Sequence, residues 1–231
     1  MLEKEEVKQL KLEKLKNGKS KKELKNQHKQ KKHRQKTHNI LLEIENSLRK
    51  QGFQKIVGID EAGRGPIAGP IVSSAVIFPP DIDIFLTKDS KKLTEKQREK
   101  LFEEIKYRAL AIGIGVVDST EIDKINIYQA TKLAMYRALE TLKTDFDFLI
   151  TDFVKFSPYP HISIKKADEK SLSVAAASII AKVYRDNIMK EFSQLYPHSF
   201  DKHKGYPTKT HKQEIREFGI TPIHRKSFKL L

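Results

Sequence analysis

The chain has 231 residues, with 45 Lys and Arg against 30 Asp and Glu, giving a formal net charge of +15. That length suits one domain with a sizeable core plus a small appendage, and the positive charge favours an anionic partner, above all nucleic acid. The absence of cysteine excludes disulfides, cysteine zinc sites and thiol nucleophiles. The sequence shows neither a secretion signal nor an apolar run near the roughly 20 residues that span a bilayer, so we expect a cytoplasmic protein without a membrane partner.

Residues 1–38 differ in composition from the rest, with 13 Lys and one Arg against five Glu. Their few leucines are too sparse for a core, and we predict a basic arm that is flexible or partly helical. The arm could grip phosphates without sequence preference, or it could serve only as a solubilising tail. Residues 39–231 are expected to form the main domain.

From Ile40 onward, apolar runs alternate with stretches of helical periodicity. We predict strands over 55–60, 71–80, 111–119 and 146–153, and helices over 40–52, 94–110, 127–142, 171–196 and 208–218. Thr94 can cap the second of these helices, with Gln97 three residues on. The alternation indicates an α/β domain. A short Gly- and Pro-containing link between the first two strands suits an antiparallel pair, so we expect a mixed sheet.

Four acidic residues stand at the ends of predicted strands or just before a helix. Asp60 and Glu61 follow the first strand, Asp152 ends the fourth, and Asp168 precedes the Ala-rich helix. Each alone could be a turn residue or a helix cap. A mixed sheet could also bring them to one edge, where divalent cations would offset their repulsion. We therefore predict a site for two Mg²⁺ or Mn²⁺ ions, which suits hydrolysis of a phosphodiester.

A glycine-rich loop follows the first two acids directly. Gly63 and Gly65 flank Arg64, and glycine allows the backbone to approach a sugar–phosphate chain closely. Main-chain groups that point at a sugar can detect the 2′-hydroxyl that separates RNA from DNA. The same residues could also form a simple tight turn.

Four motifs, in this order, resemble bacterial ribonuclease HII: GIDEAGRGPIAGP, DSKKLTEKQRE, KADEKSLSVAAASIIAKVYRD and HKGYPTKTH. The resemblance runs from about Gly52 to Phe228. It implies a ribonuclease H-like mixed sheet flanked by helices, with a helical C-terminal part, as the catalytic domain over 39–231. The implied activity is metal-dependent endonucleolytic cleavage of the RNA strand in RNA–DNA hybrids. Single ribonucleotides embedded in duplex DNA are included, cut on their 5′ side to leave 3′-hydroxyl and 5′-phosphate ends.

The resemblance also assigns site residues. The implied metal ligands and catalytic groups are Asp60, Glu61, Asp152 and Asp168. The implied substrate contacts are Gly63, Arg64, Gly65, Ser90, Lys91, Tyr206, Lys182 and Arg185. Within this set the glycine loop meets the 2′-hydroxyl, Tyr206 packs on the adjoining deoxyribose, and Ser90 with Lys91 contacts phosphate. Lys182 and Arg185 could instead be solvated charges on a helix face.

Two other functions remain compatible with the residues alone. One is a non-catalytic nucleic-acid binder, in which the acids are turn and cap residues and EDTA has no effect on binding. The other keeps the fold but cuts DNA junctions rather than ribonucleotides. We expect a monomer, and the sequence indicates no protein partner.

Overall fold

The computed structural model describes residues 37–84, 86, 93–152, 154, 156 and 159–231, together with the isolated positions 23, 26, 29 and 32. The predicted basic arm therefore lies almost entirely outside the described residues. Among the described residues, no helix combines the length and apolarity needed to cross a bilayer.

The centre of the fold is a five-stranded sheet with the order β3-β2-β1-β4-β5. Its strands are β1 (Ile56–Ala62), β2 (Ile71–Ile77), β3 (Ala111–Val117), β4 (Phe148–Thr151) and β5 (His161–Ser163). Strand β1 pairs antiparallel with β2 and parallel with β4. The predicted mixed sheet and its antiparallel first pair are thus confirmed. The three-residue edge strand β5 was not predicted, because so short a segment has no readable alternation.

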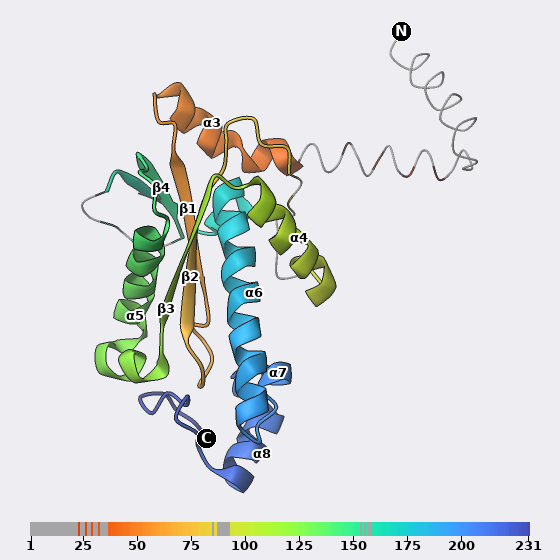
Figure 1. Ribbon diagram of the computed structural model, residues 1–231, viewed down its shortest axis with the longest axis vertical. Coiled ribbons are helices and arrows are strands. Elements are labelled where there is room, and N and C mark those ends of the chain that lie inside the picture. The colour runs from red at the N-terminus through yellow and green to blue at the C-terminus, as the bar shows by residue number, and fades with distance from the viewer. Residues whose placement is uncertain are drawn as a thin grey trace.

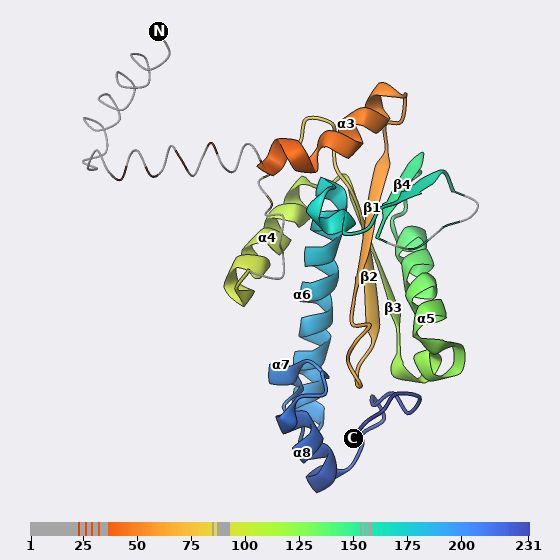
Figure 2. The same ribbon diagram turned by 180° about the vertical axis from the view of Figure 1, so that it is seen from behind.

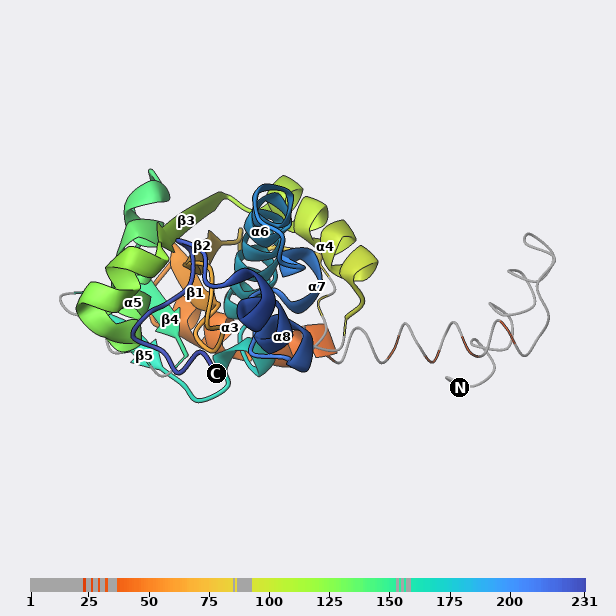
Figure 3. The same cartoon turned by 90° about the horizontal axis from the view of Figure 1, so that it is seen from below.

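Helices cover both faces of this sheet. They are α3 (Glu43–Lys50), α4 (Glu95–Arg108), α5 (Ser119–Thr141), α6 (Leu172–Leu195), α7 (Phe200–His203) and α8 (Lys209–Phe218). Helix α5 lies on one face, whereas α6 and α4 lie on the other (Figures 1 and 3). Helix α7 packs beside the last turns of α6, and α8 lies at that same end of the molecule, close to the C-terminus, as the view from behind also shows (Figure 2). The expected α/β fold with a helical C-terminal part is confirmed.

Strand β1 is buried on both faces, and its residues alternate between the two helix layers. Val57 and Ile59 pack into the cluster that α5 completes. Gly58 points the other way, where an added Cβ would lie 2.2 Å from the Ser173 carbonyl carbon of α6. Successive residues of a strand face opposite sides, so Asp60 shares the α6 face with Gly58. The absence of a side chain at Gly58 lets α6 lie directly on the strand that carries the acids.

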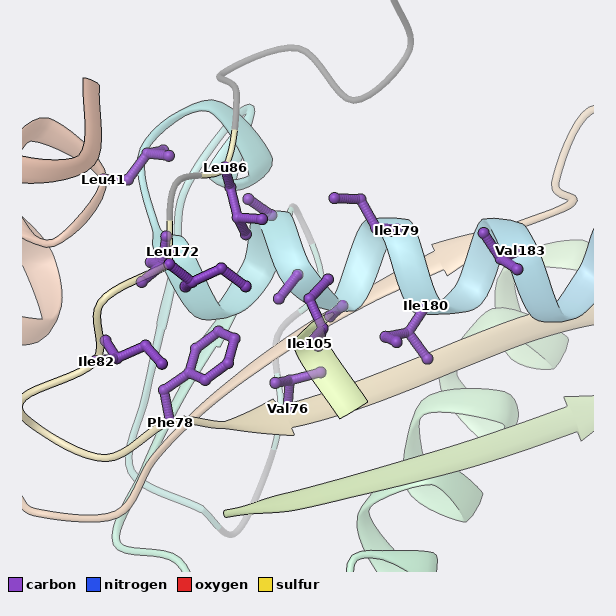
Figure 4. Close-up of a cluster of buried hydrophobic side chains, with 14 residues drawn as sticks. Leu41, Val76, Phe78, Ile82, Leu86, Ile105, Leu172, Ile179, Ile180 and Val183 are labelled. Atoms are coloured by element: carbon purple, nitrogen blue, oxygen red, sulfur yellow. The ribbon is translucent and has the colours of Figure 1, made fainter. Parts of the chain in front are cut away.

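The second core lies between β2, α4 and α6. Val76 and Phe78 pack there against Ile105 of α4 and Ile179 and Ile180 of α6 (Figure 4). These side chains are at most a few per cent exposed. This cluster fixes the helix that passes alongside the first pair of acids.

The helix starts follow local capping chemistry. The predicted Thr94–Gln97 capping box is present at the start of α4. The helix predicted from residue 127 is present, but a helical segment that was not predicted precedes it and is continuous with it in α5. That segment begins at Ser119, where the Asp118 carboxylate accepts a hydrogen bond from Glu121 N at 2.8 Å. Asn126, at φ 66°, bends α5 within the stretch that lacked helical periodicity.

Helix α3 is attached to the start of α6 by a buried carboxylate. Glu45 Oε1 accepts hydrogen bonds from Ser171 Oγ at 2.7 Å and from Ser173 N at 3.0 Å. Ser171 is itself the N-cap of α6. A negative charge is favourable at a helix N-terminus, so Glu45 helps to fix where α6 begins, four residues after Asp168.

The Gly58 contact provides a test of the fold. Gly58→Ala places a methyl group 2.2 Å from the α6 backbone, where no flexible side chain can yield. Overpacking of this kind costs about 1–3 kcal/mol or more, so we expect a clear fall in the free energy of unfolding, measured with urea. A variant as stable as the wild type would show that α6 does not approach β1 this closely.

Candidate active site

The parallel pairing of β1 with β4 brings two of the acids to the same edge of the sheet. Ile59 lies opposite Thr151 in the register, and the next residues along the two strands are Asp60 and Asp152. Asp60 is 9% exposed. Glu61 continues β1, so the sequence order Asp–Glu places two carboxylates at the point where this strand reaches the glycine loop.

Asp168 reaches this edge from the turn that precedes α6. It lies in a single 3₁₀ turn, Ala167–Glu169, and is 9% exposed. Lys166, which precedes the turn in the left-handed conformation with φ 58°, donates its backbone N–H to Asp152 Oδ1 at 3.0 Å. The turn is therefore attached to one of the acids. The helix cap is Ser171, so Asp168 is not the N-cap of α6.

The acids influence one another electrostatically. Burial raises the pKa of Asp60 well above its ordinary value, and the neighbouring charges of Glu61 and Asp168 raise it further, against a hydrogen bond from Ser178. Burial also raises the pKa of Glu61, with a contribution from Asp152. A site that resists ionisation in this way gains from a cation that neutralises it.

Within the described part of the chain, Glu61 forms an ion pair with the loop arginine. Arg64 Nη1 lies 3.4 Å from Glu61 Oε1 and opposes the rise in its pKa. The other oxygen, Oε2, is buried without a hydrogen-bond partner in the described structure. An unsatisfied buried carboxylate oxygen beside other acids is a donor that a hard divalent cation can use.

The donor set fits such a cation, but the shell is not preformed. Among the described residues, no three His, Cys, Asp or Glu side chains converge closely enough to hold a metal ion. Asp60, Glu61, Asp152 and Asp168 are therefore neighbours that perturb each other's ionisation without sharing one coordination point.

A cleft of about 440 Å³ opens beside Glu61. It is lined by Glu61, Ala62, Gly63, Arg64, Gly65, Arg98, Ser178, Lys182, Arg185 and Tyr206. The structure thus brings the glycine loop and Tyr206 together, although they are far apart in the sequence. A Cβ added to Gly65 would lie 3.5 Å from Cε1 of Tyr206, whose side chain is 45% exposed. An open backbone and an exposed aromatic ring form one wall, which can hold a sugar and the base or sugar next to it.

The two basic residues predicted on α6 differ in their surroundings. Lys182 lies at the cleft and pairs with Asp186 at 2.5 Å. Arg185 is only 1% exposed, and its guanidinium donates to the carbonyls of Ala68, Pro70 and Lys204 at 2.9–3.1 Å. Arg185 is thus not a solvated charge. Its side chain borders the cleft, but its donors are directed at the backbone carbonyls that follow the glycine loop.

Four further residues complete the comparison with the sequence. Ser90 and Lys91 lie outside the described residues. Ser178 and Arg98 line the cleft but were missed. Ser178 is one helical turn before Lys182 on α6, so the i, i+4 rule could have found it. Arg98 had no comparable signal, because its place at the cleft depends on how α4 packs on α6.

A chain of neutral histidines supports Tyr206 from behind. Thr221 N donates to His224 Nδ1 at 2.9 Å, so the proton of His224 is on Nε2, which lies 3.1 Å from His211 Nε2. His211 Nδ1 in turn donates to the Tyr206 carbonyl at 2.9 Å. Both rings are buried. This order of donors and acceptors requires both imidazoles to be neutral.

A family model described as Ribonuclease HII matches residues 57–231. The chain belongs to the ribonuclease HII family. It is 55% identical over 189 residues to the ribonuclease HII of Sulfurihydrogenibium sp. (strain YO3AOP1), a match that covers 81% of this chain and 96% of that protein. The ribonuclease HII of Aquifex aeolicus (strain VF5) is 52% identical with the same coverage. The resemblance read from the four motifs is confirmed.

Solved ribonucleases of this kind share the fold. The ribonuclease H2 of Pyrococcus horikoshii OT3 matches with a TM-score of 0.61 and 30% identity, over 76% of this chain and 94% of that one. The ribonuclease HII of Archaeoglobus fulgidus, solved in complex with PCNA, matches with a TM-score of 0.63 and 28% identity, over 77% and 96%. Membership of the ribonuclease HII family makes the chain an endoribonuclease H, an enzyme of RNA–DNA hybrids.

The histidine chain predicts how stability depends on pH. Burial lowers the pKa of His211 and of His224 to about 4, below the ordinary 6.5. The unfolded chain therefore binds protons more readily between these values, and stability falls as the pH drops from 6.5 towards 4. We expect the midpoint of thermal unfolding to fall by several degrees between pH 7 and pH 5.

The control for this prediction is His224→Gln, which removes one of the two titrating rings. It should unfold more easily than the wild type at pH 7 but lose less stability on acidification. The raised pKa of Asp60 has the opposite effect on stability, because the folded protein binds this proton more readily than the unfolded chain does. Both proteins are therefore best compared in an Asp60→Asn background, which removes this contribution to the pH dependence. Equal pH slopes for the two proteins would contradict the assignment.

Proposed function

We propose that this ribonuclease HII homologue cleaves the RNA strand of RNA–DNA hybrids and also cuts at single ribonucleotides embedded in duplex DNA. The cut lies on the 5′ side of the ribonucleotide and leaves 3′-hydroxyl and 5′-phosphate ends. The observation that carries the proposal is the cleft itself. Mutually perturbed acids from β1, the end of β4 and the turn before α6 lie beside a backbone loop and an exposed tyrosine.

In this proposal Asp60, Glu61, Asp152 and Asp168 hold Mg²⁺ or Mn²⁺. A pair of such ions supplies an activated water and stabilises the leaving oxygen of a phosphodiester. The buried, unpartnered Oε2 of Glu61 and the raised pKa of Asp60 support this role, because both reflect negative charge without enough compensation. A ribonuclease HIII with the same fold, at 20% identity and a TM-score of 0.54, was solved in complex with Mn²⁺.

Substrate selection falls to the groups on the other side of the cleft. The backbone of Gly63, Arg64 and Gly65 detects the 2′-hydroxyl, while the exposed ring of Tyr206 packs on the adjoining deoxyribose. Phosphates are attracted by Lys182 and by the part of the Arg64 guanidinium that does not contact Glu61. Ser90 and Lys91 are proposed to extend this contact along the strand. In this proposal the carboxylates perform cleavage, and the loop backbone and an aromatic ring select the substrate.

The direct test uses an end-labelled DNA duplex with one ribonucleotide, and the same duplex made only of DNA. We expect cleavage of the first alone, at the phosphodiester 5′ to the ribonucleotide, and no product with EDTA. The ends are mapped on a sequencing gel. Cleavage of the all-DNA duplex would favour the junction nuclease, and a cut on the 3′ side of the ribonucleotide would refute the proposed mechanism.

The acids are tested separately by Asp60→Asn. The loss of one buried ligand removes several kcal/mol of metal-assisted catalysis, so the cleavage rate should fall at least about 1,000-fold. Affinity for the hybrid, measured by fluorescence anisotropy, should change less than about threefold, because phosphate contacts dominate it. Asp81→Asn, at an exposed acid outside the cleft, is the matched control and should retain the wild-type rate.

A further inference from the structure

The side chain of Arg225 is fully buried beneath the glycine loop, and no motif in the sequence singled it out. Its guanidinium donates from Nη2 to the Gly63 carbonyl at 2.6 Å and from Nη1 to those of Arg64 at 3.2 Å and Pro66 at 2.7 Å. Its Nε donates to the Gly69 carbonyl at 2.9 Å. One side chain from the C-terminal segment thus binds four carbonyls of the loop that lines the cleft.

Burying the charge of Arg225 is energetically unfavourable, so the buried state depends on its hydrogen bonds to the loop. Burial, together with the nearby charge of Arg185, lowers the pKa of Arg225 to about 9. Its side chain donates four hydrogen bonds to backbone carbonyls rather than to a carboxylate. A buried cation is tolerated only when its donors are well satisfied, so the loop and Arg225 stabilise each other.

The C-terminal backbone follows the same loop. Arg225 N donates to the Ile67 carbonyl at 2.9 Å, and Gly69 N donates to the Ile223 carbonyl at 2.8 Å. Ile67 N donates to the carbonyl of Gly205, the residue before Tyr206. Figures 1 and 2 show the C-terminal segment lying beside the β1–β2 connection. The loop, the tyrosine and the C-terminal segment therefore form one hydrogen-bonded unit.

The direction of the loop amides follows from these bonds. In a trans peptide the C=O and the N–H of the next residue point in opposite directions. Because the carbonyls of Gly63 and Arg64 point at the buried Arg225, the N–H groups of Arg64 and Gly65 point away from it. Arg225 does not line the cleft, whereas Gly63, Arg64 and Gly65 do. Two adjacent amide donors are thereby directed to the cleft side of the loop.

We propose that Arg225 is the positioning residue for ribonucleotide recognition, because it orients the N–H groups of Arg64 and Gly65 towards the sugar. This inference rests on the proposed detection of the 2′-hydroxyl by the loop. Lysine cannot replace arginine here, since a single ammonium group lacks the planar fork that meets four carbonyls at once. Without Arg225 the peptide planes can rotate, and the donors lose their common direction.

The test is Arg225→Lys, with cleavage kinetics on the one-ribonucleotide duplex. We expect kcat/KM to fall about 100-fold, as misplacement of a positioning group by about 1 Å does. In an Asp60→Asn background, the ratio of the affinity for the one-ribonucleotide duplex to the affinity for the all-DNA duplex should approach one. Affinity for the all-DNA duplex should stay the same, because that affinity comes from phosphates.

Two controls separate positioning from general stability. Leu139→Ala destabilises the core on the far face of the sheet, and Lys226→Gln removes an exposed charge next to Arg225. Both should keep the wild-type preference for the ribonucleotide. A preserved preference in Arg225→Lys, or an equal loss of affinity for both duplexes, would overturn the inference. If the wild type itself fails to cut the one-ribonucleotide duplex, the proposed function fails instead.

Amide hydrogen exchange keeps the inference testable if Arg225→Lys does not fold. It is measured by NMR on the Asp60→Asn protein with Arg225 intact. The amides of Arg64 and Gly65 should become protected when the one-ribonucleotide duplex is added, and less so with the all-DNA duplex. Equal protection by the two duplexes, or none, would show that these donors do not meet the sugar.

Discussion

Like charges are brought together at one edge of the sheet, and burial makes their ionisation still less favourable. Asp60 is opposed by Glu61 and Asp168, while Glu61 is opposed by Asp152. A protein selected only for stability would separate or neutralise these carboxylates, because buried charges are tolerated when paired. The position of these acids beside a cleft lowers the stability of the fold locally, which is typical of a functional site.

The surrounding structure compensates for this cost with cations in fixed places. Arg64 pairs with Glu61 within the cleft. Behind the loop, Arg185 and Arg225 contact backbone carbonyls rather than the acids. Had either buried guanidinium formed a salt bridge with an acid, that carboxylate would have lost its capacity to bind a metal. The arginines that stabilise the site are thus kept apart from the groups proposed to perform the chemistry.

Periodicity and capping signals in the sequence were enough to predict the sheet and the long helices, because those elements form from local patterns. Asp118 shows the limit: its capping box with Glu121 starts α5 eight residues before the apolar repeat begins. The acids could be proposed because strand ends meet at a sheet edge. Arg225 could not, since the carbonyls that it binds belong to residues more than 150 positions away.

This long separation divides the site into two parts that form from different regions of the chain. The acids are carried by β1, the end of β4 and the turn before α6, all within residues 56–172. The cleft wall formed by the glycine loop and Tyr206 is complete only when Tyr206 and Arg225 lie against the loop that follows β1. The groups proposed for cleavage and those proposed for ribonucleotide selection therefore come from different parts of the structure. Under the proposed roles, changes in the C-terminal segment would alter which sugar is recognised without touching a carboxylate, because the segment would act through the direction of the loop backbone and the tyrosine ring.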